Sequence, residues 1–126
     1  MTREIIETNT YKVALLPKDI VHIHFKPSIC IEVEDVKATF AIYQELAVYQ
    51  DFKILVEFPM YTTITTEARE YGAASDLKAI AEAFVIETLA QRILARFYKV
   101  FHKKNHPLKI FMDKNEALEW LQNYDK

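Results

Sequence analysis

Two pairs of histidines are the residues whose types and spacing could support chemistry. His22 and His24 alternate in IVHIHF, so on a strand both side chains lie on one face, a spacing found in metal sites. His102 and His106 lie four residues apart at the end of a predicted helix. A tetrahedral site would require the two pairs to meet in space. Because no HExxH, CxxC or carboxylate cluster accompanies them, we favour ordinary surface histidines and predict neither a metal nor a cofactor.

Motifs for enzymatic chemistry are absent from the sequence. Gly72 is the only glycine in the chain, which rules out the glycine-rich loops of dinucleotide-binding and Walker-type phosphate sites. There is no GxSxG elbow, and Cys30, the only cysteine, lies close to Pro27 and Ser28 without a local base pattern. We therefore predict no catalytic residues and do not expect an enzyme.

The stretch YTTITTEAREYG, residues 61–72, places four threonines before a charged helical run. Thr65 or Thr66 would cap the helix by accepting a backbone N–H, and Glu67 would complement its positive end. Alternatively, the exposed helix start is a recognition surface, with Arg69 anchoring an acidic group of a partner. Capping does not use every N–H, so both interpretations can hold together. The predicted partner-binding residues are Tyr61, Thr65, Thr66, Glu67 and Arg69.

A basic stripe runs along the predicted helix of residues 89–103. Its residues recur at intervals of four, three and four, and they are Arg92, Arg96, Lys99 and Lys103. We expect this stripe on the solvated outer face, where it could attract an acidic protein or anionic headgroups in a salt-sensitive way. The opposite face should carry the inward apolar stripe, formed by Leu89, Ile93, Phe97 and Val100 or Phe101.

Length, composition and charge bound the class of protein. The chain has 126 residues, 51% of them apolar, which suits one domain with one core. The formal charge of −2 argues against a general nucleic-acid binder. A single cysteine indicates a reducing compartment, and no segment resembles a signal peptide or a run of about 18 apolar residues. We expect a cytoplasmic protein without stable membrane insertion.

Apolar periodicity predicts the order ββαβαβαβα. The expected strands cover residues 11–16, 20–25, 53–58, 79–86 and 109–112, and the expected helices cover residues 34–49, 66–74, 89–103 and the segment after Asp113. After the opening hairpin, strands alternate with helices, so the later strand pairs should be mostly parallel, with right-handed crossovers. Residues 1–10 are an N-terminal extension, and residues 11–126 form a single α/β domain with a mixed sheet.

This order resembles the STAS domains typified by anti-sigma-factor antagonists, and looks most like the small uncharacterised STAS/SEC14-like single-domain proteins of bacteria. The resemblance rests on DIVHIHFKP (residues 19–27), TEAR (residues 66–69) and HPLKIFMDKNEALEWL (residues 106–121). It spans about residues 11 to 124. None of these motifs is catalytic, so the resemblance implies a STAS-like fold and a family rather than a reaction.

The resemblance also implies a place for regulation. Signalling STAS domains carry an Asp-Ser-Ser-Gly motif at a helix start, and the partner kinase phosphorylates one serine. The matching residues in this chain are Thr65, Thr66, Glu67 and Ala68, which puts Glu67 at the regulated position. Since glutamate is not a phosphoacceptor, the segment is expected to be permanently charged, unless Thr65 or Thr66 has taken over.

Two functions follow as expectations. The first is a non-catalytic interaction or regulatory module with an unidentified protein partner, in which an exposed sheet edge of the opening hairpin would favour a homodimer. The second, by analogy with SEC14-like relatives, is a small carrier of an apolar or lipid-like ligand. It is motivated by the aromatic residues of the late elements, which are Phe84, Phe97, Tyr98, Phe101 and Phe111.

Overall fold

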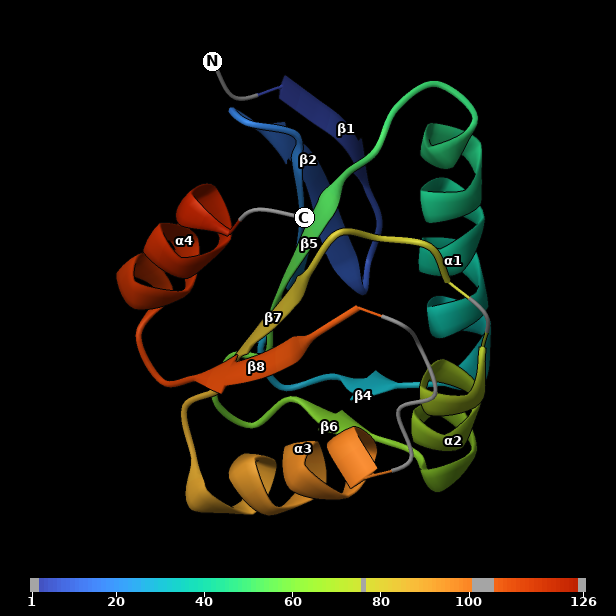
Figure 1. The fold of residues 1–126 in the computed structure, drawn as a ribbon. Coiled ribbons are helices and arrows are strands. Elements are labelled where there is room, and N and C mark those ends of the chain that lie inside the picture. The colour runs from blue at the N-terminus through green and yellow to red at the C-terminus, as the bar shows by residue number, and fades with distance from the viewer. Residues whose placement is uncertain (1–2, 76, 101–105, 125–126) are drawn as a thin grey trace.

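Strands and helices alternate along the chain after an antiparallel opening (Figure 1). The structure is a computed structural model that describes residues 3–75, 77–100 and 106–124. Its strands are β1 (Arg3–Glu7), β2 (Tyr11–Leu16), β3 (Ile20–Phe25), β4 (Cys30–Ile31), β5 (Lys53–Glu57), β6 (Thr63–Ile64), β7 (Glu82–Val85) and β8 (Leu108–Phe111). Its helices are α1 (Val33–Ala47), α2 (Thr66–Ala74), α3 (Leu89–Val100) and α4 (Lys114–Asn123).

The main sheet is mixed, with strand order β1-β2-β3-β5-β7-β8. Strands β1, β2 and β3 pair antiparallel, and β3, β5, β7 and β8 pair parallel. This arrangement confirms the predicted fold class, and the predicted hairpin has the same bounds in the structure. Its turn places Lys18 and Asp19 at positive φ, 66° and 61°, without a glycine. Strand β1, rather than the hairpin, forms the first edge of the sheet.

The sheet separates two apolar cores because successive strand residues point to opposite faces. Val21, Ile23 and Ile54 belong to the larger core, which also contains residues of α1, α2 and α3. Ile20 and Leu55 face the other way into a smaller core, which contains Ala117 and Leu121 of α4. Helix α4 packs against β5, β7 and β8, so it covers the part of this face that these three strands form.

A two-stranded parallel sheet of β4 and β6 lies apart from the main sheet (Figure 1). Cys30 pairs with Thr63 and Ile31 with Ile64, and the Thr65 N–H donates to Ile31 O at 3.0 Å. Both strands lead directly into helices, so this pairing holds the start of α2 beside the segment that enters α1.

Helix α3 is rotated relative to the prediction. Only Ala95 and Tyr98 are buried in it, whereas Leu89, Ile93, Phe97 and Val100 are 72%, 50%, 56% and 75% exposed. The predicted inward apolar stripe is therefore wrong for these four residues, and Phe101 lies outside the described residues. We call these four residues the α3 ridge.

Polar contacts in the first turn of α3 explain this rotation. Gln91 Nε2 donates to Pro59 O at 2.8 Å and to Thr62 O at 3.3 Å, and its Oε1 accepts from Glu87 N at 2.8 Å. Tyr98, two turns further on the same face, packs its ring 5.1 Å from that of Phe84. With Gln91 and Tyr98 both facing inward, the apolar ridge faces outward.

Candidate functional site

The start of α2 combines a structural cap with exposed side chains. Thr65 Oγ1 accepts a hydrogen bond from Ala68 N at 3.1 Å, which is the N-cap contact expected for Thr65 or Thr66. Thr66 and Glu67 are exposed at the first helical turn. The cap therefore uses Thr65 and leaves Thr66 and Glu67 facing solvent.

The loop before this helix is tightly held. Thr62 is buried, and its Oγ1 donates to Lys26 O at 2.7 Å. Met60 N donates to Glu87 Oε2 at 3.1 Å, and Gln91 holds the loop from the side of α3. Tyr61 lies between these anchors with a φ of 67° and 74% of its surface exposed. A tyrosine is thus presented to solvent in a backbone conformation that favours glycine.

Arg69 of α2 is half-buried, and its side chain lies on the side of the helix that faces α3. It borders an open groove of about 380 Å³ between the two helices, which we call the α2–α3 groove. The groove is lined by Arg69, Glu70, Ala73, Ala74, Leu94, Phe97 and Tyr98. The predicted anchor residue and the α3 ridge therefore share one surface, because Phe97 belongs to both the ridge and the groove.

The predicted basic stripe is exposed, but the apolar ridge that was predicted to face inward lies beside it on the outer surface. Arg92, Arg96 and Lys99 are exposed, and Lys103 lies outside the described residues. At 3.6 residues per turn, Arg96 falls beside the α3 ridge, and Arg92 and Lys99 fall along one side of it. Basic and apolar side chains thus share the outer surface of α3. No helix within the described residues is long and apolar enough to span a membrane.

The aromatic residues that suggested a ligand carrier do not gather around one cavity. Phe84 and Tyr98 line two adjoining pockets of about 50 Å³ each, beside Phe58. Phe97 lines only the open α2–α3 groove at the surface, and Phe111 packs against Trp120 in the other core. Ligand pockets usually measure about 300 Å³ or more, so these pockets are too small for a lipid-like ligand.

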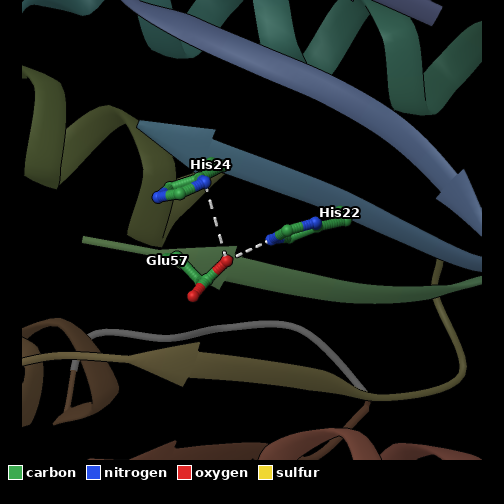
Figure 2. Close-up of side chains that lie close together, drawn as sticks. All are labelled: His22, His24 and Glu57. Carbon is green, nitrogen blue, oxygen red and sulfur yellow. Dashed lines mark hydrogen bonds and ion pairs between the residues drawn. The ribbon is translucent and has the colours of Figure 1, made fainter. Parts of the chain in front are cut away.

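A second group of polar side chains (Figure 2) lies on the same face of the sheet as Ile20 and Leu55, the face that carries α4. His22 and His24 project from β3 toward the carboxylate of Glu57 on β5, and His24 and Glu57 are register partners. Glu57 Oε2 accepts a short hydrogen bond from His22 Nε2 and lies 3.8 Å from His24 Nδ1. The imidazole rings stack with centroids 5.7 Å apart. We call these three residues the histidine–glutamate cluster.

The electrostatics of this cluster favour an ionised carboxylate at Glu57 and a neutral imidazole at His24. Burial tends to raise the pKa of Glu57, but the hydrogen bond from His22 and the nearby charges of His22, His24 and Lys114 outweigh it, so the pKa is lowered. Burial is also the largest influence on His24, and it lowers that pKa below 6.5 against the attraction of Glu57. His24 is therefore mainly neutral near pH 7, with a free nitrogen lone pair.

Among the described histidines, His106 does not lie with His22 and His24. His106 Nε2 lies 3.1 Å from Glu82 Oε1, and both side chains are buried. Glu82 pairs in register with Ile54, which faces the larger core, whereas His22 and His24 lie on the opposite face. His102 lies outside the described residues. Sequence reasoning missed Glu57, because only the parallel register of β3 and β5 brings it to the histidines.

Comparison with known proteins identifies a family and a fold. Residues 14–125 match the family model described as a domain of unknown function, DUF7793. The chain is also similar to the crystal structure of an uncharacterised protein of the DUF3478 family with a SpoIIAA-like fold, from Shewanella loihica PV-4. The two are 20% identical with a TM-score of 0.58, over 93% of this chain and 99% of that one. Among curated proteins, none matches the chain.

Proposed function

This chain belongs to the DUF7793 family, and we propose that it is a non-catalytic protein-interaction module that binds its partner through the outer surface of α3. The SpoIIAA-like fold agrees with the expected anti-sigma-factor-antagonist resemblance. The observation that carries the proposal is the α3 ridge, four exposed apolar residues on one helix face. The partner we propose is a protein with an apolar groove bordered by acidic side chains, acting in the cytoplasm.

The α3 ridge leaves apolar side chains exposed to water, where they contribute little of the stability that burial would give them. Fully burying a Leu, Ile, Phe or Val side chain stabilises by about 1.5–3 kcal/mol, and the ridge leaves most of this gain unused. Its residues are separated by four, four and three positions, which is the pattern of a helix that docks into a groove. Exposed contiguous apolar surface of this kind marks binding sites.

The basic residues around the α3 ridge favour a partner with acidic side chains. Arg92, Arg96 and Lys99 border the ridge on α3, and Arg69 lies across the α2–α3 groove. Acidic side chains around an apolar groove would pair with these cations while the ridge is buried. We include Thr66, Glu67 and Tyr61 in the proposed interface, because they are exposed at or before the start of α2 and belong to the partner-binding residues expected from the sequence.

Capture from native lysate at low salt tests the proposal with the wild-type chain and three full-length variants. The binding variants are Phe97→Ser, which shortens the ridge, and Arg96→Glu, which reverses the charge beside it. Lys78→Glu is the matched control, because Lys78 is also exposed but lies in the connection between α2 and β7. We expect one protein to be retained by the wild type and by Lys78→Glu and to be lost from both binding variants, and the same protein to bind after purification.

Three outcomes would overturn this proposal. Equal capture by all variants would place the interface elsewhere. Sedimentation of the purified wild type as a dimer, with the Phe97→Ser variant monomeric, would show that the ridge is covered by a second copy. Co-sedimentation of the wild type with anionic phospholipid vesicles, without any protein partner, would identify a peripheral membrane surface instead.

A further inference from the structure

The histidine–glutamate cluster has the composition and geometry of a transition-metal site. Its three candidate ligand atoms, one from each of His22, His24 and Glu57, all lie within 4.8 Å of one another. Two imidazoles and one carboxylate form a donor set used for zinc in proteins, with a fourth position left to water or another ligand. From this geometry we propose that the cluster binds one divalent transition-metal ion of the zinc type.

The positions of the ligands are set by regular structure rather than by loops. His22 and His24 are two residues apart on β3, and Glu57 is the register partner of His24 on the parallel strand β5. In a tetrahedral zinc site with bonds of about 2.0–2.1 Å, neighbouring ligand atoms are about 3.4 Å apart. Side-chain rotation therefore suffices to close the site, and the strands need not separate.

The hydrogen bond between His22 and Glu57 marks where the ion would bind. His22 Nε2 and Glu57 Oε2 already approach one another across a single hydrogen. A metal ion takes the place of this hydrogen, and the displaced proton moves to Nδ1 of His22 or to solvent, because a metal-bound imidazole nitrogen carries no proton. His24 Nδ1 then supplies the third bond.

Access and charge around the cluster also bear on binding. The His24 side chain is 48% exposed, so an ion can reach the site from solvent, whereas those of His22 and Glu57 are only 11% and 15% exposed. The lysines facing the cluster are Lys12, which is paired with Glu4 at 3.0 Å, and Lys114, whose Nζ lies 3.6 Å from Glu57 Oε2. Lys114 thus competes with a metal for the carboxylate, and removing its charge should tighten metal binding.

Imidazole ligands select among metals. Zn²⁺, Co²⁺, Ni²⁺ and Cu²⁺ bind imidazole well, whereas Mg²⁺ and Ca²⁺ prefer sites made of oxygen ligands. The site is spatially separate from the proposed docking surface, because it lies on the α4 face of the sheet and the α3 ridge lies beyond the other core. Failure of either proposal therefore leaves the other intact.

Calorimetric titration of the full chain, produced without a polyhistidine tag, tests this site with Zn²⁺ and Mg²⁺. We expect one saturable Zn²⁺ site per chain and no comparable Mg²⁺ binding. His24→Ala and Glu57→Gln should each weaken Zn²⁺ binding at least about tenfold, since even outer-shell changes cost 10- to 100-fold. Lys114→Met should strengthen it several-fold. Glu45→Gln is the control, because it removes an exposed carboxylate from α1, on the opposite side of the sheet, and should leave the affinity unchanged.

Co²⁺ gives a spectroscopic signal of direct coordination, which nonspecific attraction of the ion to charged residues would not produce. With Co²⁺ in the site, visible absorption typical of four- or five-coordinate cobalt should appear in the wild type and disappear in His24→Ala. Circular dichroism without metal confirms that each variant folds. If Glu57→Gln fails to fold, the half-exposed His24 position decides the question. Absence of saturable Zn²⁺ binding, or wild-type affinity in folded His24→Ala, would overturn the proposal.

Discussion

Gly72 of α2 lies directly against the ring of Tyr98 of α3, so that a Cβ atom at residue 72 would stand 3.1 Å from Tyr98 Cε2 and 3.3 Å from its hydroxyl oxygen. The only glycine in the chain is thus a packing position where two helices approach closely. It serves no phosphate loop. The contact fixes the distance between α2 and α3, and with it the width of the α2–α3 groove.

Gly72→Leu should destabilise the protein by about 1–3 kcal/mol, because the larger side chain overpacks the contact with Tyr98 and Val36. Ala74→Leu is the matched control, since Ala74 lies in the same helix but is exposed. Urea unfolding measures both free energies. Similar values for the two variants would show that the helices do not meet tightly at Gly72.

The two threonines at the start of α2 should differ in their contribution to stability. Thr65→Ala removes the side-chain oxygen that accepts from Ala68 N, and should lower the free energy of unfolding by about 1 kcal/mol. Thr66→Ala, at an exposed position that does not cap the helix, should change it by less than about 0.5 kcal/mol. Thermal and urea unfolding distinguish the two. A larger loss for Thr66→Ala would assign the cap to the other threonine.

Substitutions on the α3 ridge should barely affect stability. Ile93→Ser and Phe97→Ser remove exposed apolar surface and should each change the free energy of unfolding by less than about 1 kcal/mol. Leu121→Ala, in the smaller core, should cost about 2–5 kcal/mol. Urea unfolding of all three variants makes the comparison. A loss of about 3 kcal/mol or more for Phe97→Ser would place the ridge inside the core, as the sequence suggested.

The buried tyrosines predict the response to alkali. Burial, followed by the negative charge of Glu82, raises the pKa values of Tyr43 and Tyr98 well above 10.0. Their contribution to stability is therefore fully present below about pH 10 and is lost as pH rises toward the folded pKa, because the unfolded chain releases these protons first. Tyrosinate absorbance and circular dichroism, followed together, should show a late group of tyrosines ionising only as the chain unfolds.

A Tyr98→Phe variant should contain one tyrosine fewer in that late group. Complete ionisation of all seven tyrosines before any change in circular dichroism would contradict the predicted burial of Tyr43 and Tyr98.

Two substitutions of Tyr61 distinguish the effect of its backbone conformation on stability from the effect of its ring on binding. Because its φ is 67°, Tyr61→Gly should be about 1 kcal/mol more stable than Tyr61→Ala, which keeps a side chain in the left-handed region. Both variants should lose affinity for the protein partner, since the exposed ring is gone from each. Partner capture and urea unfolding, measured on the same samples, test this pair. Undiminished capture by Tyr61→Ala would remove Tyr61 from the interface.

The sequence predicted most of the fold because the strands and helices carry strong local patterns. The hairpin, α1, α2 and the capped start of α4 all agree with the expected elements. Strands β4 and β6 have two residues each, too few for any periodic signal, and they form only because Ile31 and Ile64 meet in the tertiary fold. Strand β7 is shorter than expected, because only residues 82–85 of the apolar run pair with their neighbours.

The functional surfaces were harder to foresee. Apolar periodicity identifies one face of α3 but does not say whether that face points inward, and Gln91 decides it through contacts with residues about 30 positions away. Likewise, His22 and His24 were visible in the sequence, whereas Glu57 is brought to them by strand register. Periodicity reports local geometry, and both of these outcomes depend on contacts between distant segments.

The end of β5 places two very different neighbours in adjacent positions. The carboxylate of Glu57 faces the histidines, while the ring of the next residue, Phe58, lies on the other side of the sheet beside Phe84 and lines the pockets beneath α3. One peptide unit therefore connects the histidine–glutamate cluster to the pockets beneath α3. If an ion at Glu57 changed the affinity for the partner through Phe58, thermodynamic reciprocity would require the partner to change the affinity for the ion by the same factor. The end of β5 would then link the binding of a metal ion on one face of the sheet to the binding of a protein partner on the other.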